Sequence, residues 1–238
     1  MAVNPSVHRS GKERRLYIWV AVLTPIIVLI GFARTYYLKG VFGTPALPGL
    51  LVHIHGIVMT AWVILFITQV WLVAARRTKL HKRLGVLGAI LAALVFLLGA
   101  AVAISAAARG GSPGPPPLVF LIIPLGDILV FSILIATALF YRRRTDIHKR
   151  LMVLATVNLM APAIARFPLS FIETGGPLIF FALTDLFLLT CIAFDTIKNR
   201  RLHPAFALGA VLIIALQPLR LMFAETDIWL RFATWLVS

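Results

Sequence analysis

A small set of polar and ionisable side chains lies inside long apolar stretches of this sequence. Such groups are costly in hydrocarbon, so they are candidates for ligand binding, proton exchange or mutual pairing. Imidazole nitrogens ligate a metal or haem iron and hydrogen-bond a quinone carbonyl, whereas arginine holds propionates or an acidic headgroup. The candidate ligand-binding or cofactor-binding residues are His53, His55, Asp127, Asn158, Arg166, Asp185, Gln217 and Arg220.

The composition identifies the kind of protein that carries these groups. Of the 238 residues, 61% are hydrophobic and 13% are charged, and the mean hydropathy is +0.97. Soluble domains are about half apolar and a quarter charged, so the composition excludes a water-soluble domain and a disordered chain. The single cysteine, Cys191, excludes a disulfide framework within the chain. We therefore interpret residues 1–238 as one membrane domain whose first partner is the lipid bilayer.

Apolar runs long enough to cross a bilayer set the predicted architecture. A helix needs about 20 apolar residues to span the hydrocarbon core. The sequence predicts an all-α polytopic bundle of seven transmembrane helices, at roughly 16–34, 50–75, 84–108, 115–141, 151–172, 177–197 and 204–223. The apolar run from Ile228 to Val237 is too short to span. It predicts a short C-terminal helix in the membrane interface, capped by Thr226 or Asp227.

The basic residues predict the orientation of the chain. Seventeen of the 23 Lys and Arg residues lie in the N-terminal segment and in the loops 76–83, 142–150 and 198–201. This asymmetry predicts a cytoplasmic N-terminus and an external C-terminus in a bacterial inner membrane, with the loops 35–49 and 109–116 outside. Because the clusters alternate with apolar runs, the net charge of +15 reflects topology and does not indicate nucleic-acid binding.

An internal repeat divides the chain into helical hairpins. Residues 76–87 and 143–154 share nine of twelve amino acids, and residues 200–204 form a weaker third copy. Each copy joins an inward-running span to an outward-running one, so the sequence predicts one leading helix and three hairpins of the same orientation. The loop histidines His81, His148 and His203 are interpreted as imidazoles at the headgroup level, although a functional role stays open.

The second and third hairpins carry the same charges. Asp127 and Asp185 precede the repeated loop, and Arg166 and Arg220 follow it, all at matching depths in the outer half of the bilayer. Each arginine is predicted to lie near one of the aspartates, because unpaired charge at that depth is prohibitive. The first hairpin has Thr60 in place of the aspartate and carries histidines instead.

The two histidines fall on different faces of their helix. His53 is seven residues before Thr60, so His53 is predicted to face the bundle interior. His55 recurs with Trp62 and Gln69 every seven residues and is predicted to pack against a neighbouring span or against the loop 35–49. Residues two apart are about 200° apart on a helix, so His53 and His55 can ligate one metal ion only if the helix is distorted.

Two later spans combine a proline with an arginine. In the span 151–172, Asn158, Pro162 and Arg166 recur every four residues and are predicted to form one stripe. In the last span, Gln217 lies one turn from Arg220. These positions complete a predicted polar pocket in the outer half of the membrane.

Several strings resemble known membrane proteins. The strings are VHIHG at 52–56, LHKRLG at 80–85, HKRLM at 148–152 and AIAR at 163–166. Together they resemble a family of uncharacterised bacterial multi-pass membrane proteins, over the second to fifth predicted spans. The HKRLM string is also similar to small membrane proteins linked to cytochrome oxidase assembly. Inward-facing histidines are more distantly similar to b-type cytochromes, which implies haem b, although bis-histidine ligation needs two helices.

Four functions are compatible with these residues, and the sequence does not assign catalytic residues or say whether the protein is an enzyme. The leading hypothesis is that the polar pocket binds a small hydrophobic ligand or a redox cofactor, either haem or a quinone, with electron transfer as its role. A proton-coupled transporter would exchange protons at Asp127 and Asp185. A zinc-dependent membrane hydrolase would place His53, His55, Asp127 and Asp185 around the zinc ion, with the two histidines as metal ligands. In a structural or assembly factor, the charge pairs would only hold the helices of the bundle together. An oligomer in the membrane is compatible with each of these functions.

Overall fold

The computed structural model describes residues 5–112 and 114–238, with side chains from Arg15 onward in the first helix. The side chains of Arg9, Lys12 and Arg14 therefore lie outside the description, as does Pro113 in the connector 109–116. The described residues form helices and no strand: α1 (Pro5–Phe32), η1 (Ala33–Tyr37), α2 (Lys39–Phe42), α3 (Leu50–Ala74), α4 (Thr78–Ala108), α5 (Pro117–Phe140), α6 (Thr145–Asn158), α7 (Ala161–Ile164), α8 (Ser170–Asn199), α9 (Pro204–Phe223) and α10 (Asp227–Val237).

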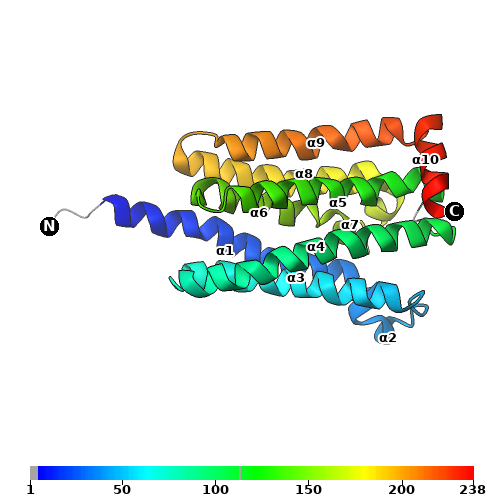
Figure 1. Ribbon diagram of the computed structural model, residues 1–238, viewed down its shortest axis with the longest axis horizontal. Helices are drawn as coiled ribbons and strands as arrows, with labels where there is room; N and C mark the ends of the chain where they lie inside the picture. Colours follow the sequence, from blue (N-terminus) through cyan, green and yellow to red (C-terminus); the bar gives the residue numbers. More distant parts are fainter. Residues whose placement is uncertain (1–4, 113) are drawn as a thin grey trace.

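Six helices are long and apolar enough to cross a membrane, which fits a multi-pass membrane protein and confirms the all-α class. They are Arg15–Tyr37, Leu50–Ala74, Thr78–Ala108, Pro117–Phe140, Ser170–Asn199 and Pro204–Phe223. These helices lie side by side along the long axis, and α10 crosses one end of the bundle (Figure 1).

The fifth predicted span, a single helix over 151–172, is wrong. The helix α6 ends at Asn158, the four-residue α7 follows, and the backbone is not helical again until Ser170. Pro162 lies in the first turn of α7, where its missing N–H costs nothing, but it could not continue α6. Because of this break, Asn158, Pro162 and Arg166 do not form one regular stripe.

The sixth predicted span, 177–197, lies within the longer helix α8. Six residues of α8 precede a kink at Gly176, whose φ of 62° and ψ of −158° are accessible almost only to glycine. Pro177 follows the kink and cannot supply a backbone N–H to the preceding turn. The outer part of α8 is thereby turned relative to its longer apolar part.

The predicted C-terminal helix is confirmed as α10. The Thr226 hydroxyl caps it by accepting a hydrogen bond from the backbone N–H of Trp229 at 3.3 Å. The indole N–H of Trp229 donates to the carbonyl of Leu118 at 2.8 Å. This bond ties α10 to the start of α5, so α10 closes the end of the bundle at which α5 begins.

The helices α5 and α6 form the centre of the bundle. Val130, Phe131 and Ala138 of α5 and Val153–Val157 of α6 are almost entirely buried. Two helices approach closely where side chains are small. A Cβ atom on Gly31 of α1 would lie 2.1 Å from the carbonyl oxygen of Ala163, so α1 packs directly on the backbone of α7.

Candidate functional site

Arg220 and Asp127 form a buried ion pair between α9 and α5. The Arg220 Nη1 atom donates to Asp127 Oδ1 at 2.7 Å and to the carbonyl of Ile123 at 2.9 Å, and Nε donates to the carbonyl of Leu216 at 3.1 Å. Gly126 makes room for the pair, because a Cβ atom there would lie 2.2 Å from Arg220 Cδ. The predicted pairing of Arg220 is confirmed, and the pair joins two helices.

Two other predicted residues also form hydrogen bonds between helices. Gln217 donates to Asp185 Oδ1 at 2.9 Å, linking α9 to α8. Asn158 donates to the carbonyl of Asp127 at 2.8 Å, linking the end of α6 to α5. The structure therefore brings Asp127, Asn158 and Arg220 together, while Asp185 meets an amide rather than a predicted arginine.

Arg166 has a different environment from Arg220. Its Nη1 atom donates to the carbonyl of Pro162 at 2.7 Å, and its guanidinium lies 4.9 Å from the centre of the Phe32 ring. Among the described residues it forms no ion pair, so the predicted pairing of Arg166 with an aspartate is not found at contact distance. A guanidinium has five N–H donors, and most of those of Arg166 stay available.

The predicted inward orientation of His53 is wrong, whereas His55 lies against the neighbouring helix α4, as predicted. His53 is exposed, and its carbonyl accepts a hydrogen bond from the Tyr36 hydroxyl at 3.3 Å. His55 lies on the inner face, where its Nδ1 atom is buried and has no hydrogen-bond partner among the described residues. The large indole of Trp62 sets this orientation: it is 4% exposed and packs edge-on against Phe131, with ring centres 5.1 Å apart.

His55 lies where three parts of the chain meet. Its Cε1 atom would be 3.8 Å from a Cβ atom on Gly99 of α4, and the Ile128 side chain of α5 lies against the same glycine. His55 and Arg166 both keep unused hydrogen-bonding capacity, and we define these two residues as the outer site.

The described residues contain no group of three or more His, Cys, Asp or Glu side chains able to hold a metal ion. His53 and His55 also occupy different faces of α3, so they do not form a shared metal site. A zinc-hydrolase centre has no support in this part of the chain.

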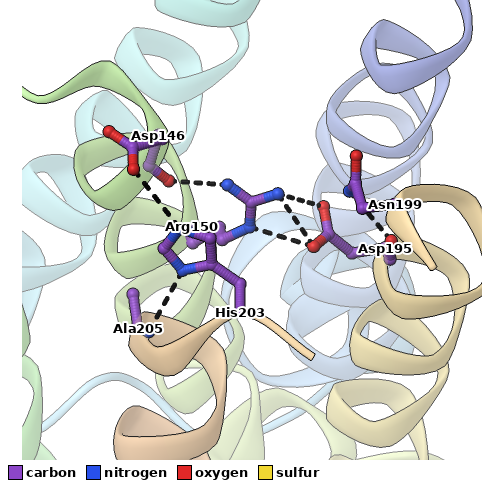
Figure 2. A network of polar contacts seen from close by, with 6 residues as sticks. All are labelled: Asp146, Arg150, Asp195, Asn199, His203 and Ala205. Atoms are coloured by element: carbon purple, nitrogen blue, oxygen red, sulfur yellow. Dashed lines mark hydrogen bonds and ion pairs between the residues drawn. The ribbon is translucent and has the colours of Figure 1, made fainter. Parts of the chain in front are cut away.

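The sequence analysis missed a second buried ion pair, at the opposite end of the bundle. Arg150 of α6 donates from Nε and Nη2 to the two carboxylate oxygens of Asp195 in α8, both at 2.9 Å (Figure 2). Arg150 Nη1 also donates to the carbonyl of Asp146 at 2.8 Å. The sequence analysis counted Arg150 among the basic residues of the loop 142–150. Asp195, an acid inside a predicted span, was the signal available for this pair.

His203 caps α9 beside this pair. Its Nδ1 atom accepts from the backbone N–H of Ala205 at 3.1 Å, so Nε2 carries the proton and donates to Asp146 Oδ2 at 3.4 Å (Figure 2). Desolvation raises the pKa of the Asp146 carboxyl, but hydrogen bonds from His203 and the backbone outweigh it and leave the pKa below its usual value. His203 therefore has a structural role in joining two hairpins.

The other two repeat histidines meet at the same end. The ring centres of His81 and His148 are 6.5 Å apart, and His148 Nδ1 donates to the carbonyl of Ala138 at 2.8 Å. The backbone carbonyl of His81 accepts from Gln69 Nε2 at 3.2 Å. These contacts tie the first turns of α4 and α6 to neighbouring helices.

Comparisons with known proteins do not assign a family. No protein-family profile, curated protein or solved structure matches the chain. The geometry separates the predicted site residues into three groups. Hydrogen bonds within the protein engage Asp127, Asn158, Asp185, Gln217 and Arg220, whereas His55 and Arg166 keep unused hydrogen-bonding capacity and His53 is exposed.

Proposed function

We propose that the protein binds a lipid-soluble small molecule at the outer site, with His55 and Arg166 as its polar contacts. The observation that carries this proposal is the buried Nδ1 atom of His55, which lacks a partner among the described residues. A buried polar atom left unpaired costs about 1–3 kcal/mol, so a ligand atom or water that satisfies it is favoured.

The chemistry of the outer site favours a quinone among the redox cofactors. A neutral imidazole offers one donor and one acceptor, and a guanidinium offers several donors, which suits the carbonyl oxygens of a quinone head. Haem b fits the outer site less well than a quinone does. It needs a second axial ligand that His53 cannot supply from the other face of α3, and Arg220 is engaged with Asp127 rather than free for a propionate.

The proposal includes a topology with seven crossings in a bacterial inner membrane. The segments α6 and α7 follow one another along the bundle (Figure 1), and together they supply the fifth crossing as a discontinuous helix. Irregular backbone is tolerated at membrane depth where protein covers it, and Met160, Ala161 and Ala163 are buried. Seven crossings put the two termini on opposite sides, and the distribution of Lys and Arg favours a cytoplasmic N-terminus, with His55 and Arg166 at the outer end.

The same topology pairs the helices as three hairpins after α1. These are α3 with α4, α5 with α6 and α7, and α8 with α9. The gathering of His81, His148 and His203 at one end of the bundle supports this arrangement, because each begins an outward-running segment.

Binding of a short-chain quinone analogue tests the proposed function. We expect purified protein in lipid nanodiscs to bind decyl-ubiquinone, measured by quenching of tryptophan fluorescence. The variant His55→Ala should bind about tenfold more weakly, which corresponds to the ~1.4 kcal/mol of one hydrogen bond. The matched control is His53→Ala, which removes an exposed imidazole from the same helix and should bind like the unmodified protein. Equal binding by both variants would contradict the proposal.

A further inference from the structure

Asp185 is an acidic residue in the middle of a helix long and apolar enough to cross the membrane. It lies nine residues after the kink at Gly176 and 14 residues before the end of α8 at Asn199. At 1.5 Å per residue, the second separation is about 21 Å along the helix axis. Its partner Gln217 lies 13 residues after the start of α9 at Pro204, so the two side chains meet far from that end of the bundle.

The side chain of Asp185 lies at the border between the buried and the exposed faces of α8. Phe181 and Leu188 are 3% and 0% exposed, whereas Leu186 and Leu189 are 63% and 50% exposed. Asp185 is half-buried, on the side of α8 that meets α9, and these two helices run side by side (Figure 1). In a membrane, hydrocarbon covers the exposed face of α8 and reaches the carboxyl group.

The side chain bonded to Asp185 is a neutral amide. Gln217 Nε2 donates to Asp185 Oδ1 at 2.9 Å, and within the described part of the chain neither carboxyl oxygen forms an ion pair. Two other acids of the apolar helices differ, because Asp127 pairs with Arg220 and Asp195 pairs with Arg150. Asp185 therefore lacks the counter-charge that these two acids have.

The cation closest to Gln217 along α9 is directed away from Asp185. Arg220 follows Gln217 by three residues, and its Nη1 atom donates to Asp127 Oδ1 at 2.7 Å. Its guanidinium lies 5.2 Å from the centre of the Phe181 ring. Phe181 precedes Asp185 by one turn of α8, so an aromatic ring of α8 meets the guanidinium where a carboxylate does not.

The other charges on the elements that pack against α8 lie toward the ends of the bundle. These elements are α1, α6, α7 and α9. In α8 itself, Asp195 lies ten residues from Asp185, about 15 Å along the axis. The remaining charged or titratable groups with described side chains are Arg15 in α1, Arg34 in η1, Asp146, His148, Lys149 and Arg150 in α6, Arg166 after α7, Glu173 and Lys198 in α8, and His203 before α9.

We propose that Asp185 and Gln217 form a proton-binding site in the membrane, open to the lipid, in which the carboxyl group holds an exchangeable proton at neutral pH. An ionised carboxylate without a counter-charge is strongly disfavoured in hydrocarbon, and taking up one proton from water neutralises it. The amide suits the protonated form, because its N–H donates to the acid carbonyl oxygen while the acid O–H has the amide oxygen as an acceptor. Uptake and release change only this O–H bond, so the site needs no redox partner.

Labelling with dicyclohexylcarbodiimide tests the site. This apolar reagent adds to protonated carboxyl groups that it reaches from the lipid, and peptide mass spectrometry locates the adduct. In liposomes at neutral pH, Asp185 should react at least about tenfold faster than Asp127 or Asp195, since an unpaired acid in hydrocarbon keeps its proton. Those two acids are matched controls in the same chain, because each is ionised against an arginine. Raising the pH should slow the labelling of Asp185.

Infrared spectroscopy measures the proton itself. The C=O stretching band of a protonated carboxyl group should be present in the unmodified protein at neutral pH and absent in Asp185→Asn, which keeps the size of the side chain. Should Asp185→Asn not fold, loss of the band at high pH in the unmodified protein gives the same reading.

The other outcomes overturn the proposal or a defined part of it. Equal labelling of the three acids, or a spectrum of Asp185→Asn that keeps the whole band, would show that Asp185 holds no special proton. Protection of Asp185 by sodium ions at constant pH and ionic strength would mean that a metal cation neutralises the carboxylate instead. The infrared band without any label at Asp185 would overturn its opening to the lipid.

Discussion

At the scale of single residues, the buried polar side chains fall into two classes. Some use their hydrogen-bonding groups within the protein, and others keep part of that capacity free. Arg220 and Arg150 each face a buried carboxylate and backbone carbonyls, so their donors point inward. Buried ion pairs of this kind are costly to break, because the remaining charge has no solvent. Arg166 and His55 differ, since their hydrogen-bonding groups are only partly used. This contrast separates the stabilising residues from the candidate ligand contacts.

Removing one partner of the Arg220–Asp127 pair should be more harmful than removing both. We expect Arg220→Met to destabilise the protein by about 3–5 kcal/mol, because Asp127 stays buried without its cation. The double variant Arg220→Met with Asp127→Leu should recover most of that loss. Thermal and denaturant unfolding in detergent measures the loss of stability in the single variant and in the double variant. Additive losses in the double variant would show that the two side chains do not act as a pair.

At the scale of helices, an aromatic contact packs the inner face of α3 against α5. His55, Trp62 and Gln69 recur every seven residues on its inner face, and each carries a buried polar atom with no partner in the described part of the chain. Of the three, Trp62 makes the largest apolar contact, with Phe131 of α5. The packing of α3 therefore depends on the shape of the indole rather than on its N–H group.

Two substitutions at Trp62 separate shape from hydrogen bonding. Trp62→Phe keeps an aromatic ring against Phe131 and loses an N–H group that has no partner, so we expect a loss of about 1–2 kcal/mol. Trp62→Ala leaves a cavity and should cost about 3–5 kcal/mol. The midpoint of thermal unfolding ranks the two variants. Equal losses would mean that the indole N–H binds a group, such as a buried water, that matters as much as the packing.

The kink in α8 depends on the backbone freedom of glycine. Gly176 has a φ of 62° and a ψ of −158°, so Gly176→Ala should destabilise the protein by about 1–3 kcal/mol. Gly85→Ala is the matched control, because Gly85 lies in helix α4 with open space around it and alanine favours helix there. Thermal unfolding should move in opposite directions for the two variants. A neutral Gly176→Ala would show that the kink relaxes without cost.

At the scale of the whole molecule, the number of crossings decides where the chain ends. Six helices pass the length and hydropathy requirements of a membrane span, and α6 with α7 supplies a broken seventh segment. An even number of crossings would return the C-terminus to the side of the N-terminus. An odd number would place it on the opposite side, as the distribution of Lys and Arg predicts.

Reporter fusions distinguish these topologies. A reporter fused after Ser238 should be active outside the cytoplasm, and one inserted within 142–150 should be active in the cytoplasm. Paired alkaline phosphatase and fluorescent-protein fusions give both readings. A cytoplasmic C-terminus with an unchanged 142–150 reading would mean that α6 and α7 do not cross, and His55 and Arg166 would then not share one side of the membrane.

The features that could be predicted from the sequence are those set by neighbouring residues. Hydropathy and run length are local properties, so they predicted the helical class, most of the spans and the separate α10 with its Thr226 cap. The pairing of the charges could not be predicted in the same way. Which arginine meets which aspartate depends on how each helix is rotated and tilted, and a helix that is apolar all round does not specify its inner face. Packing of Trp62 on Phe131 turned His55 inward instead of His53, and the break after Asn158 moved Arg166 away from the carboxylates.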